Sequence, residues 1–115
     1  MKVVVTTQGT TLDSTVDPRF GRAGTFLLVD TETMEVTAHE NSAAQESQGA
    51  GTQAARSVIM LGAKAVITGH IGPRAFAVFQ AAGLPVFVAE QGATVREAIE
   101  AFKAGKLPRI NQPNV

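Results

Sequence analysis

The second half of this sequence alternates helix-like and strand-like segments that are joined by only a few residues. Apolar residues recur at helical spacing over 54–61, and a short apolar run follows at 65–68. A second helix is predicted over 73–83, a strand over 85–89 and a third helix over 94–105. Because a helix connects each of these strands to the next, the strands must be parallel and their crossovers right-handed.

The first half of the sequence adds three strands before the first helix. Residues 3–5 are all valine, which is typical of a strand buried on both faces, and the polar residues 6–17 are predicted to form a loop. Two more strands, over 25–30 and 34–39, are separated by a hairpin-length connection and should be antiparallel. A polar loop is predicted over 40–51. The order β-β-β-α-β-α-β-α therefore predicts an α/β fold with a five-stranded mixed sheet and helices on both faces.

Length and composition favour one small globular domain. The chain has 115 residues, of which 44% are hydrophobic and 17% charged, and we expect a single domain over 1–105 followed by an irregular tail over 106–115. Ten basic residues balance ten acidic ones, so no net charge attracts nucleic acid or an anionic membrane. With no signal-peptide pattern and no apolar run long enough to cross a bilayer, a cytoplasmic protein is expected.

Several kinds of chemistry are excluded by the residues that are missing. The chain has no cysteine, which excludes disulfides and every thiolate-held metal site. It also lacks a nucleophile-elbow motif. Residues 49–54, G-A-G-T-Q-A, match the dinucleotide-binding pattern, but no strand leads straight into them and the acid expected about twenty positions later is missing. An enzyme is therefore not expected.

The segment that closes the first loop is the first candidate site, and it reads Asp17-Pro18-Arg19-Phe20-Gly21-Arg22. Arg19 and Arg22 offer planar sets of donors that suit polyanions, and Gly21 permits a close backbone approach. The alternative is purely structural: Phe20 anchors the loop in the core, and the arginines pair with Asp13 and Asp17. The sequence alone leaves both interpretations open.

A strand-to-helix turn is the second candidate site, and it reads Gly69-His70-Ile71-Gly72-Pro73-Arg74. Its glycines permit a tight turn, and free amides at a helix start favour an anion. Arg74 puts positive charge where a helix ordinarily prefers acid, which indicates an anionic partner. His70 is the best candidate for a metal or sulfide contact, whereas His39, in an apparent edge strand, is assigned a structural role. A plain turn with no ligand is the alternative.

The predicted topology brings these two segments together. If the first strand lies beside the fourth, chain direction diverges between them, and the loop over 6–22 meets the turn over 69–74 at their carboxyl ends. Ribonuclease H-like nucleases share this order of elements, but they need carboxylates around metal ions, and strands 3–5 and 65–68 contain none. A ligand crevice is expected, and a nuclease is not.

Several motifs along the chain occur together in one known family. They are an N-terminal V-V-V strand, D-P-R-F-G-R-A, G-A-G, A-V-I-T-G-H-I-G-P-R-A, A-A-G-L-P-V, and T-V-R-E-A-I followed by A-G-K-L. In this combination the chain resembles the dinitrogenase iron-molybdenum cofactor biosynthesis (NifX-like) family. The resemblance implies a ribonuclease H-like fold that binds or relays nitrogenase-type iron-sulfur cofactors. In the orange protein branch it implies a molybdenum-copper sulfide cluster held without covalent ligation, which fits a cysteine-free chain better.

We therefore expect a non-catalytic carrier of an anionic metal-sulfur cluster, of the iron-sulfur or molybdenum-copper sulfide type, held noncovalently. The expected contacts are Arg19, Phe20, Gly21, Arg22, Gly69, His70, Ile71, Gly72 and Arg74, with His70 as the candidate metal ligand. Expected partners are cluster donor or acceptor proteins or ATPases, without nucleic acid or a membrane. The alternatives are a phosphate- or nucleotide-binding regulator that uses the same anion site, and an adaptor without a ligand.

Overall fold

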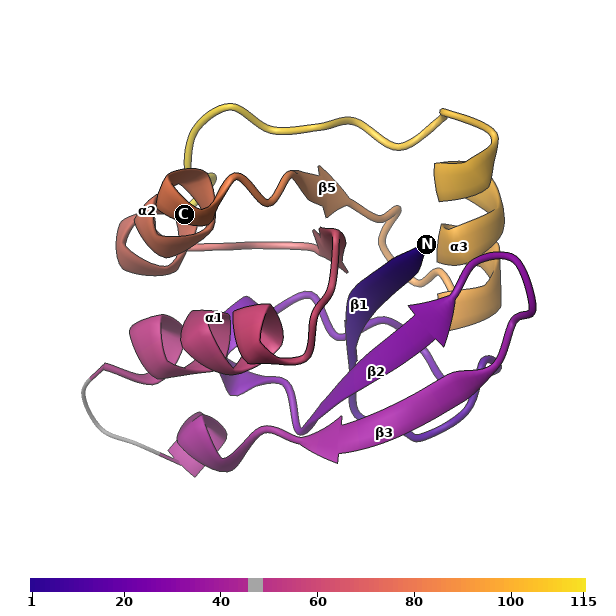
Figure 1. Ribbon diagram of the computed structural model, residues 1–115, viewed down its shortest axis with the longest axis horizontal. Coiled ribbons are helices and arrows are strands. Elements are labelled where there is room, and N and C mark those ends of the chain that lie inside the picture. Colours follow the sequence, from indigo (N-terminus) through magenta and orange to yellow (C-terminus); the bar gives the residue numbers. More distant parts are fainter. Residues whose placement is uncertain (46–48) are drawn as a thin grey trace.

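Residues 1–45 and 49–115 are described by the structure, which is a computed structural model. Within these ranges five strands are found: β1 (Lys2–Thr7), β2 (Thr25–Asp30), β3 (Val36–Glu40), β4 (Ala65–Thr68) and β5 (Val86–Val88). They form one sheet in the order β3-β2-β1-β4-β5, and β2 runs antiparallel to both of its neighbours (Figure 1). The parallel pairs β1–β4 and β4–β5 make the sheet mixed, as predicted.

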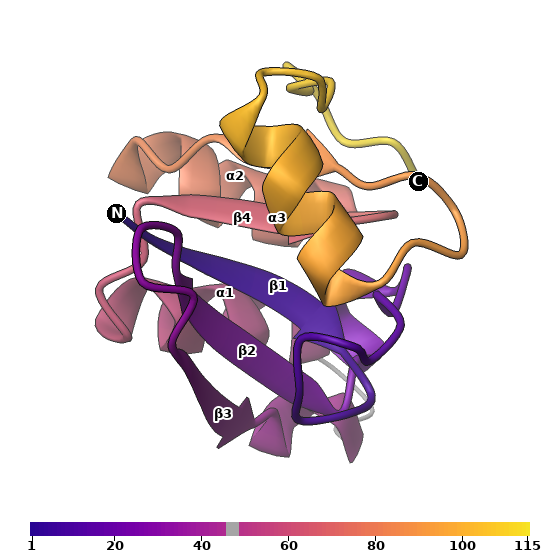
Figure 2. The same cartoon turned by 90° about the vertical axis from the view of Figure 1, so that its right-hand side faces the viewer.

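Helices cover both faces of the sheet, which confirms the predicted architecture. In the described ranges the α-helices are α1 (Ala50–Met60), α2 (Pro73–Ala82) and α3 (Val95–Lys103). Figures 1 and 2 show α1 and α2 on one face and α3 on the other. Two short 3-10 helices, η1 (Phe20–Arg22) and η2 (Ser42–Gln45), lie against α1. The sheet therefore separates two hydrophobic cores, one under each helical layer.

β1 occupies the centre of the sheet, and its valines at 3–5 have no exposed surface. Their side chains alternate between the two cores, as expected for a strand buried on both faces. Thr6 and Thr7 extend the strand, so the prediction that these two residues begin a loop was wrong. Both are fully buried, and the Thr6 hydroxyl donates to the carbonyl oxygen of Asp17 at 2.7 Å. A β-branched side chain with a satisfied hydroxyl is compatible with a buried strand.

The hairpin and the following segment also differ in detail from the prediction. β2 and β3 are antiparallel as expected, but β3 begins later, because Met34 adopts a positive φ of 63° in the turn. Within the polar loop predicted over 40–51, residues 42–45 form η2, and α1 begins before its predicted start. Residues 46–48 of that loop lie outside the described residues.

Local capping signals are confirmed at the ends of two helices. Pro73 occupies the first position of α2, and Gly83 follows that helix with a φ of 73°. At the start of α3 the Thr94 hydroxyl accepts from the Glu97 N–H at 3.1 Å, and the Glu97 carboxylate accepts from the Thr94 N–H at 2.9 Å. This is the predicted capping box.

The tail over 106–115 runs along the outer edge of β5 and then toward α2 (Figure 1). The Val88 N–H donates to the Pro108 carbonyl, and the Ile110 N–H donates to the Val86 carbonyl, both at 3.0 Å. The tail thus covers part of a sheet edge that would otherwise expose unpaired backbone groups.

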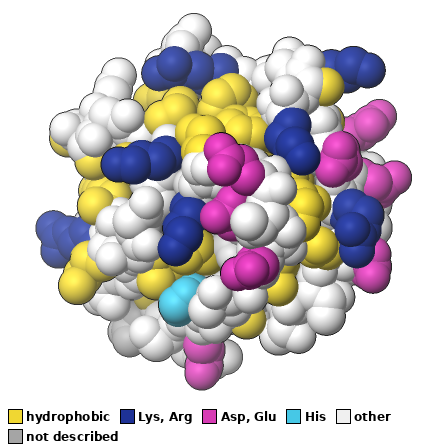
Figure 3. All heavy atoms as spheres, turned by 45° about the vertical axis from the view of Figure 1, so that its right-hand side comes forward, with side chains coloured by type: hydrophobic (Ala, Val, Ile, Leu, Met, Phe, Trp, Pro, Cys, Tyr) yellow, Lys and Arg dark blue, Asp and Glu magenta, His cyan; other side chains and the backbone are white. Residues whose placement is uncertain are grey.

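Charges of both signs are interspersed on the surface that Figure 3 shows. None of the helices in the described ranges combines the length and apolar character needed to cross a membrane. With ten basic and ten acidic residues the chain has no net field, so an anion has to be attracted by a local group of donors.

Candidate functional site

The carboxyl ends of β1 and β4 lie side by side, and the chain leaves them in different directions. β1 pairs in parallel with β4 on one side, while the chain after β1 returns as the antiparallel strand β2 on the other side. β4 instead leads into α2. In open α/β sheets, ligand crevices form at such a divergence, outside the carboxyl ends of the strands. The loop after β1 and the turn after β4 meet there, as the sequence predicts.

Backbone hydrogen bonds join the two candidate segments directly. The His70 N–H donates to the Pro18 carbonyl, and the Phe20 N–H donates to the His70 carbonyl at 3.1 Å. Arg19 and His70 are therefore bridge partners. Gly69 lies so close to the loop that a β-carbon on it would be 2.7 Å from the Cα of Pro18. Only a glycine permits this approach. Because the two segments are bridged, the side chains of Arg19 and His70 start from neighbouring positions on the backbone.

A buried carboxylate orients the Arg19 side chain. Arg19 Nε donates to Asp17 Oδ1 at 3.2 Å, and Arg19 Nη2 donates to Asp17 Oδ2 at 3.0 Å. Asp17 also accepts from the Arg19 backbone N–H at 2.9 Å and from the side-chain amide of Gln8. The Asp17 side chain is 2% exposed and that of Arg19 is 61% exposed. The two-point pair fixes the guanidinium while leaving further N–H donors at the surface.

The same contacts set the charge state of the pair. Burial raises the pKa of the Asp17 carboxyl, but hydrogen bonds from the Arg19 side chain and backbone and from Gln8 outweigh burial, and its pKa lies below the ordinary value. The hydrogen bond to Asp17 raises the pKa of Arg19. The structural alternative considered for this loop is thus correct for Arg19 and Asp17, whereas Asp13 pairs with Arg96 at 3.3 Å.

Arg22 connects η1 to η2. Its Nη1 donates to the Ala44 carbonyl at 2.7 Å. The Asn41 side-chain amide donates to the carbonyl oxygens of Gly21 at 3.2 Å and Ala23 at 2.9 Å. Asn41 was not identified from the sequence, because an asparagine in a polar segment carries no signal for a partner so far along the chain. Together these bonds hold the backbone of η1 against η2.

Two of the predicted site residues place their side chains in the core. Phe20 is 2% exposed and contacts the rings of Phe79, edge-on at a centroid distance of 5.2 Å, and Phe26, stacked at 5.9 Å. Ile71 is 1% exposed in the same core. These side chains anchor the loop and the turn in the core and do not face a ligand, and the backbone N–H groups of both residues are bonded within the protein.

The start of α1 reaches the same edge of the sheet through small residues. A β-carbon on Gly21 would lie 3.3 Å from the Gly51 Cα, and a β-carbon on Gly51 would lie 3.5 Å from the Ala75 β-carbon. η1 and the first turns of α1 and α2 are therefore packed together. The G-A-G segment, whose context excludes a dinucleotide site, serves here in close packing against η1 and α2.

The first turn of α2 offers backbone donors at the crevice. Gly72 is its N-cap and provides no side-chain cap, and Phe76 is the first residue whose N–H bonds to the Gly72 carbonyl, at 3.0 Å. Among the described residues, the N–H groups of Arg74 and Ala75 have no hydrogen-bond acceptor. The exposed Arg74 side chain adds charge to this positive end of the helix dipole. Such a helix start favours an anion.

On its other side, the turn after β4 is held by the C-terminal tail. Asn114 Nδ2 donates to the Gly69 carbonyl at 2.9 Å, the Ile71 N–H donates to Asn114 Oδ1 at 2.8 Å, and the Asn114 N–H donates to the Ile71 carbonyl at 3.2 Å. The Ile71 N–H, like the His70 N–H, is therefore already bonded and is not open to an anion. Asn114 has no signal in the sequence, because it lies 43 residues from Ile71 and no local pattern links the two.

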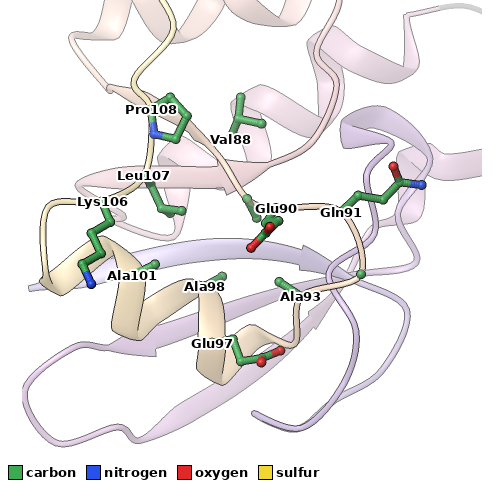
Figure 4. Close-up of a pocket in the computed structure, with 12 residues that line it drawn as sticks. Val88, Glu90, Gln91, Ala93, Glu97, Ala98, Ala101, Lys106, Leu107 and Pro108 are labelled. Carbon is green, nitrogen blue, oxygen red and sulfur yellow. The ribbon is translucent and has the colours of Figure 1, made fainter.

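Two hollows lie near this end of the molecule. One of about 600 Å³ is lined by the first loop, with Arg19 among its lining residues. The other, of about 630 Å³, lies between the end of β5, α3 and the tail (Figure 4). Small and apolar residues make up most of its lining, and Glu90, Glu97 and Lys106 are its charged residues. It contains none of the predicted site residues.

The donors at the crevice suit an anion better than a bare metal ion. Across residues 1–45 and 49–115, no group of three or more His, Cys, Asp or Glu side chains could hold a metal ion. The groups present are guanidinium, imidazole and amide N–H donors, which bind anionic oxygens or sulfides. The residues therefore fit a cluster that is held through its own anionic atoms.

Fold and site together define a small α/β domain whose loops gather at the carboxyl ends of two central parallel strands. The model of the family described as dinitrogenase iron-molybdenum cofactor matches residues 1–105, and the chain belongs to this family. The resemblance noted in the sequence motifs is thereby confirmed.

The chain is also similar to solved structures and to a curated relative. The apo form of the orange protein from Desulfovibrio gigas is 42% identical, with a TM-score of 0.95, and the match covers 99% of this chain and 96% of that one. A Thermotoga protein of the DUF35 family is 34% identical, with a TM-score of 0.85 and coverage of 99% and 97%. An uncharacterized Methanocaldococcus jannaschii protein is 34% identical over 98 residues, which are 83% of this chain and 82% of that protein. The relation to nitrogenase cofactor proteins rests on the family model.

Proposed function

We propose that the protein is a non-catalytic carrier that binds an anionic metal-sulfur cluster in the crevice between the first loop and the start of α2. The observation that supports this most directly is the backbone bridge between Arg19 and His70, beside a helix start with open N–H groups. The bridge thus brings a guanidinium and an imidazole, from segments far apart in sequence, next to each other, and the amide donors of α2 begin four residues after His70. Proteins that receive or deliver the cluster, including ATPases, would be its partners.

Binding would proceed through charge-assisted hydrogen bonds to the sulfides of the cluster. Arg19, oriented by Asp17, and Arg74, at the helix start, provide charge, while the Arg74 and Ala75 N–H groups provide directed donors. His70, which is exposed, is the single imidazole at the crevice and the candidate for direct contact with metal or sulfide. Gly69 and Gly21 contribute close backbone approach, and Gly72 is the N-cap of the helix that presents the N–H donors.

A molybdenum-copper sulfide cluster is favoured over an iron-sulfur cluster as the cargo. The chain has no cysteine, and protein-held iron-sulfur clusters ordinarily depend on thiolates. The 42% identity to the orange protein points the same way. We also assign the fold to the ribonuclease H-like class, an assignment supported by the element order β-β-β-α-β-α at the start of the chain.

Titration of apo-protein with tetrathiomolybdate and copper(I) under anaerobic conditions tests this function. The expected result is a saturable, coloured complex of defined stoichiometry. Arg74→Ala should weaken binding about tenfold, the effect of one lost charge-assisted hydrogen bond. Lys64→Ala is the matched control, because it also removes one exposed cation. Lys64 precedes β4 and so lies at the amino end of that strand, away from the proposed site at its carboxyl end.

The alternative function is regulation by a phosphate or nucleotide bound at the same anion site. The open N–H groups of Arg74 and Ala75 favour this alternative as well, because phosphate binds helix starts in the same way. A colourless protein that binds nucleotide saturably, and that takes up neither tetrathiomolybdate with copper(I) nor iron with sulfide, would establish the alternative and reject the carrier.

A further inference from the structure

We propose that Asn114 is a positioning residue of the binding site: it holds the turn after β4 in the shape that presents His70 and the start of α2 to the ligand. This inference rests on the proposed function, because the ligand is the anionic cluster described there. It makes the C-terminal tail part of the site.

Asn114 pairs with the turn as a neighbouring strand would. Its side-chain amide accepts from the Ile71 N–H at 2.8 Å and donates to the Gly69 carbonyl at 2.9 Å, and its backbone N–H donates to the Ile71 carbonyl at 3.2 Å. An asparagine side chain carries a donor and an acceptor side by side, so it reproduces the pattern of a peptide group. Three bonds from one residue therefore fix the backbone on both sides of His70.

The turn needs this support, because its two glycines leave its backbone with large conformational freedom. Gly69 and Gly72 flank His70 and Ile71, and glycine has the largest conformational freedom of all residues. On one side the turn is bonded to the first loop: the His70 N–H donates to the Pro18 carbonyl, and the His70 carbonyl accepts from the Phe20 N–H. Asn114 supplies the corresponding bonds on the other side. The turn is thus held between two chain segments.

His70 depends on the backbone for its orientation. Among the described residues its side chain has no hydrogen bond or ion pair, and it is exposed. Its Cα–Cβ direction is consequently set by the conformation of residues 69–71. The α2 donors begin just beyond this segment, at Arg74, so the same bonds also fix the point from which the helix starts.

Backbone hydrogen bonds to β5 anchor the tail before it reaches the turn. It is anchored first along β5, where Pro108 and Ile110 bond to strand residues at 3.0 Å, and Pro113 restricts the backbone just before Asn114. Figure 1 shows the tail running from the end of α3 past β5 toward α2. Ordering these residues has an entropic cost, which the bonds to β5 and to the turn offset.

If the tail instead blocked the binding site, the opposite effect on affinity would be expected. Asn114 Oδ1 accepts from an N–H that an anion would otherwise use, so a tail that only blocks the site would lower affinity. Removing the Asn114 side chain would then strengthen binding. A positioning residue requires that its removal weakens binding.

The experiment compares Asn114→Ala with Asn111→Ala, the same substitution in the same tail. Asn111 is exposed, and its side chain makes no hydrogen bond among the described residues. The first measurement, on apo-protein, is amide hydrogen exchange at Ile71 by NMR. Loss of two hydrogen bonds should accelerate this exchange about tenfold in Asn114→Ala, with no change in Asn111→Ala. The second is the affinity for tetrathiomolybdate with copper(I), which should fall about fivefold or more in Asn114→Ala only.

Each outcome decides between the possibilities. Faster exchange at Ile71 together with weaker binding supports the proposal. Unchanged exchange overturns it, and so does faster exchange with unchanged or tighter binding, while in both cases the carrier function stands. If the wild-type protein itself does not bind the probe, the proposed function fails first, and the positioning role for this ligand fails with it. A lower melting temperature with unaltered affinity would assign Asn114 a structural role only.

Discussion

Gly69 offers the sharpest test of how the crevice is built, because a single methyl group there meets backbone atoms. In Gly69→Ala the new β-carbon would lie 2.7 Å from the Cα of Pro18 and 2.9 Å from its carbonyl oxygen. Ordinary contacts begin at 3.4 Å. The loop and the turn would therefore have to separate by about 0.7 Å, since neither contact is with a flexible side chain that could move aside.

The free energy of unfolding should fall by about 1–2 kcal/mol. Inserting a methylene into a tightly packed place costs about 1–3 kcal/mol, and the lower entropy of an unfolded chain with Ala instead of Gly returns about 0.4–1 kcal/mol. For a domain of this size the melting temperature should drop by about 4–10 °C. The separation also lengthens the backbone bonds between His70 and the segment Pro18–Phe20, so affinity for tetrathiomolybdate with copper(I) should fall as well.

Gly72→Ala is the matched control in the same turn. A β-carbon on Gly72 would have nothing within 4 Å, and the φ of Gly72 is −82°, which alanine adopts readily. The weaker capping by Ala and the lower entropy of the unfolded chain nearly cancel, so we expect a change of about 0.5 kcal/mol or less.

Urea unfolding followed by far-UV circular dichroism is the appropriate assay, because the chain has no Trp or Tyr for fluorescence. A Gly69→Ala protein as stable as wild type, or a Gly72→Ala protein destabilised to the same extent, would refute the close-approach argument.

Two further predictions concern charge. Because hydrogen bonds hold the pKa of folded Asp17 below its ordinary value, its ionised form contributes stability above the unfolded pKa, and this contribution is lost as pH falls through the folded pKa. Asp17→Asn should therefore be less stable than wild type at about pH 7, with the difference shrinking toward about pH 3 in urea unfolding; a constant difference would contradict this. If the cluster is held mainly by arginines and amides, its affinity should fall with added salt, and His70→Ala should lower it less than Arg74→Ala does, as isothermal titration can measure. If affinity does not depend on salt but is lost on acidification and in His70→Ala, then His70 is a metal ligand.

Local patterns were sufficient wherever the structure depends on residues a few positions apart. Pro73 and Gly83 delimit α2, and Thr94 and Glu97 start α3, as predicted. These caps can be predicted from the sequence because a helix cap joins groups within one turn of the chain. The valines at 3–5 likewise predicted a strand buried on both faces.

Patterns were insufficient where burial depends on distant partners. Thr6 and Thr7 are polar enough to suggest a loop, yet they are fully buried, and the Thr6 hydroxyl bonds to Asp17 and lies 2.8 Å from the Thr68 hydroxyl oxygen. Phe20 and Ile71 looked like site residues from their neighbours in the motifs, but their side chains are in the core. Asn114 had no signal at all.

By itself, the sequence determined the order of the elements, the parallel pairing that short crossovers require, and the set of side chains able to hold an anion. Only the tertiary structure decided which of them meet: Arg19 is aimed by Asp17, His70 is bridged to Arg19, and the turn is held by Asn114. The physical reason is the separation along the chain between the residues that interact. Periodicity and capping arise from contacts within about four residues. The crevice, in contrast, arises from backbone bonds between segments that become neighbours only when β1 and β4 pair in the sheet.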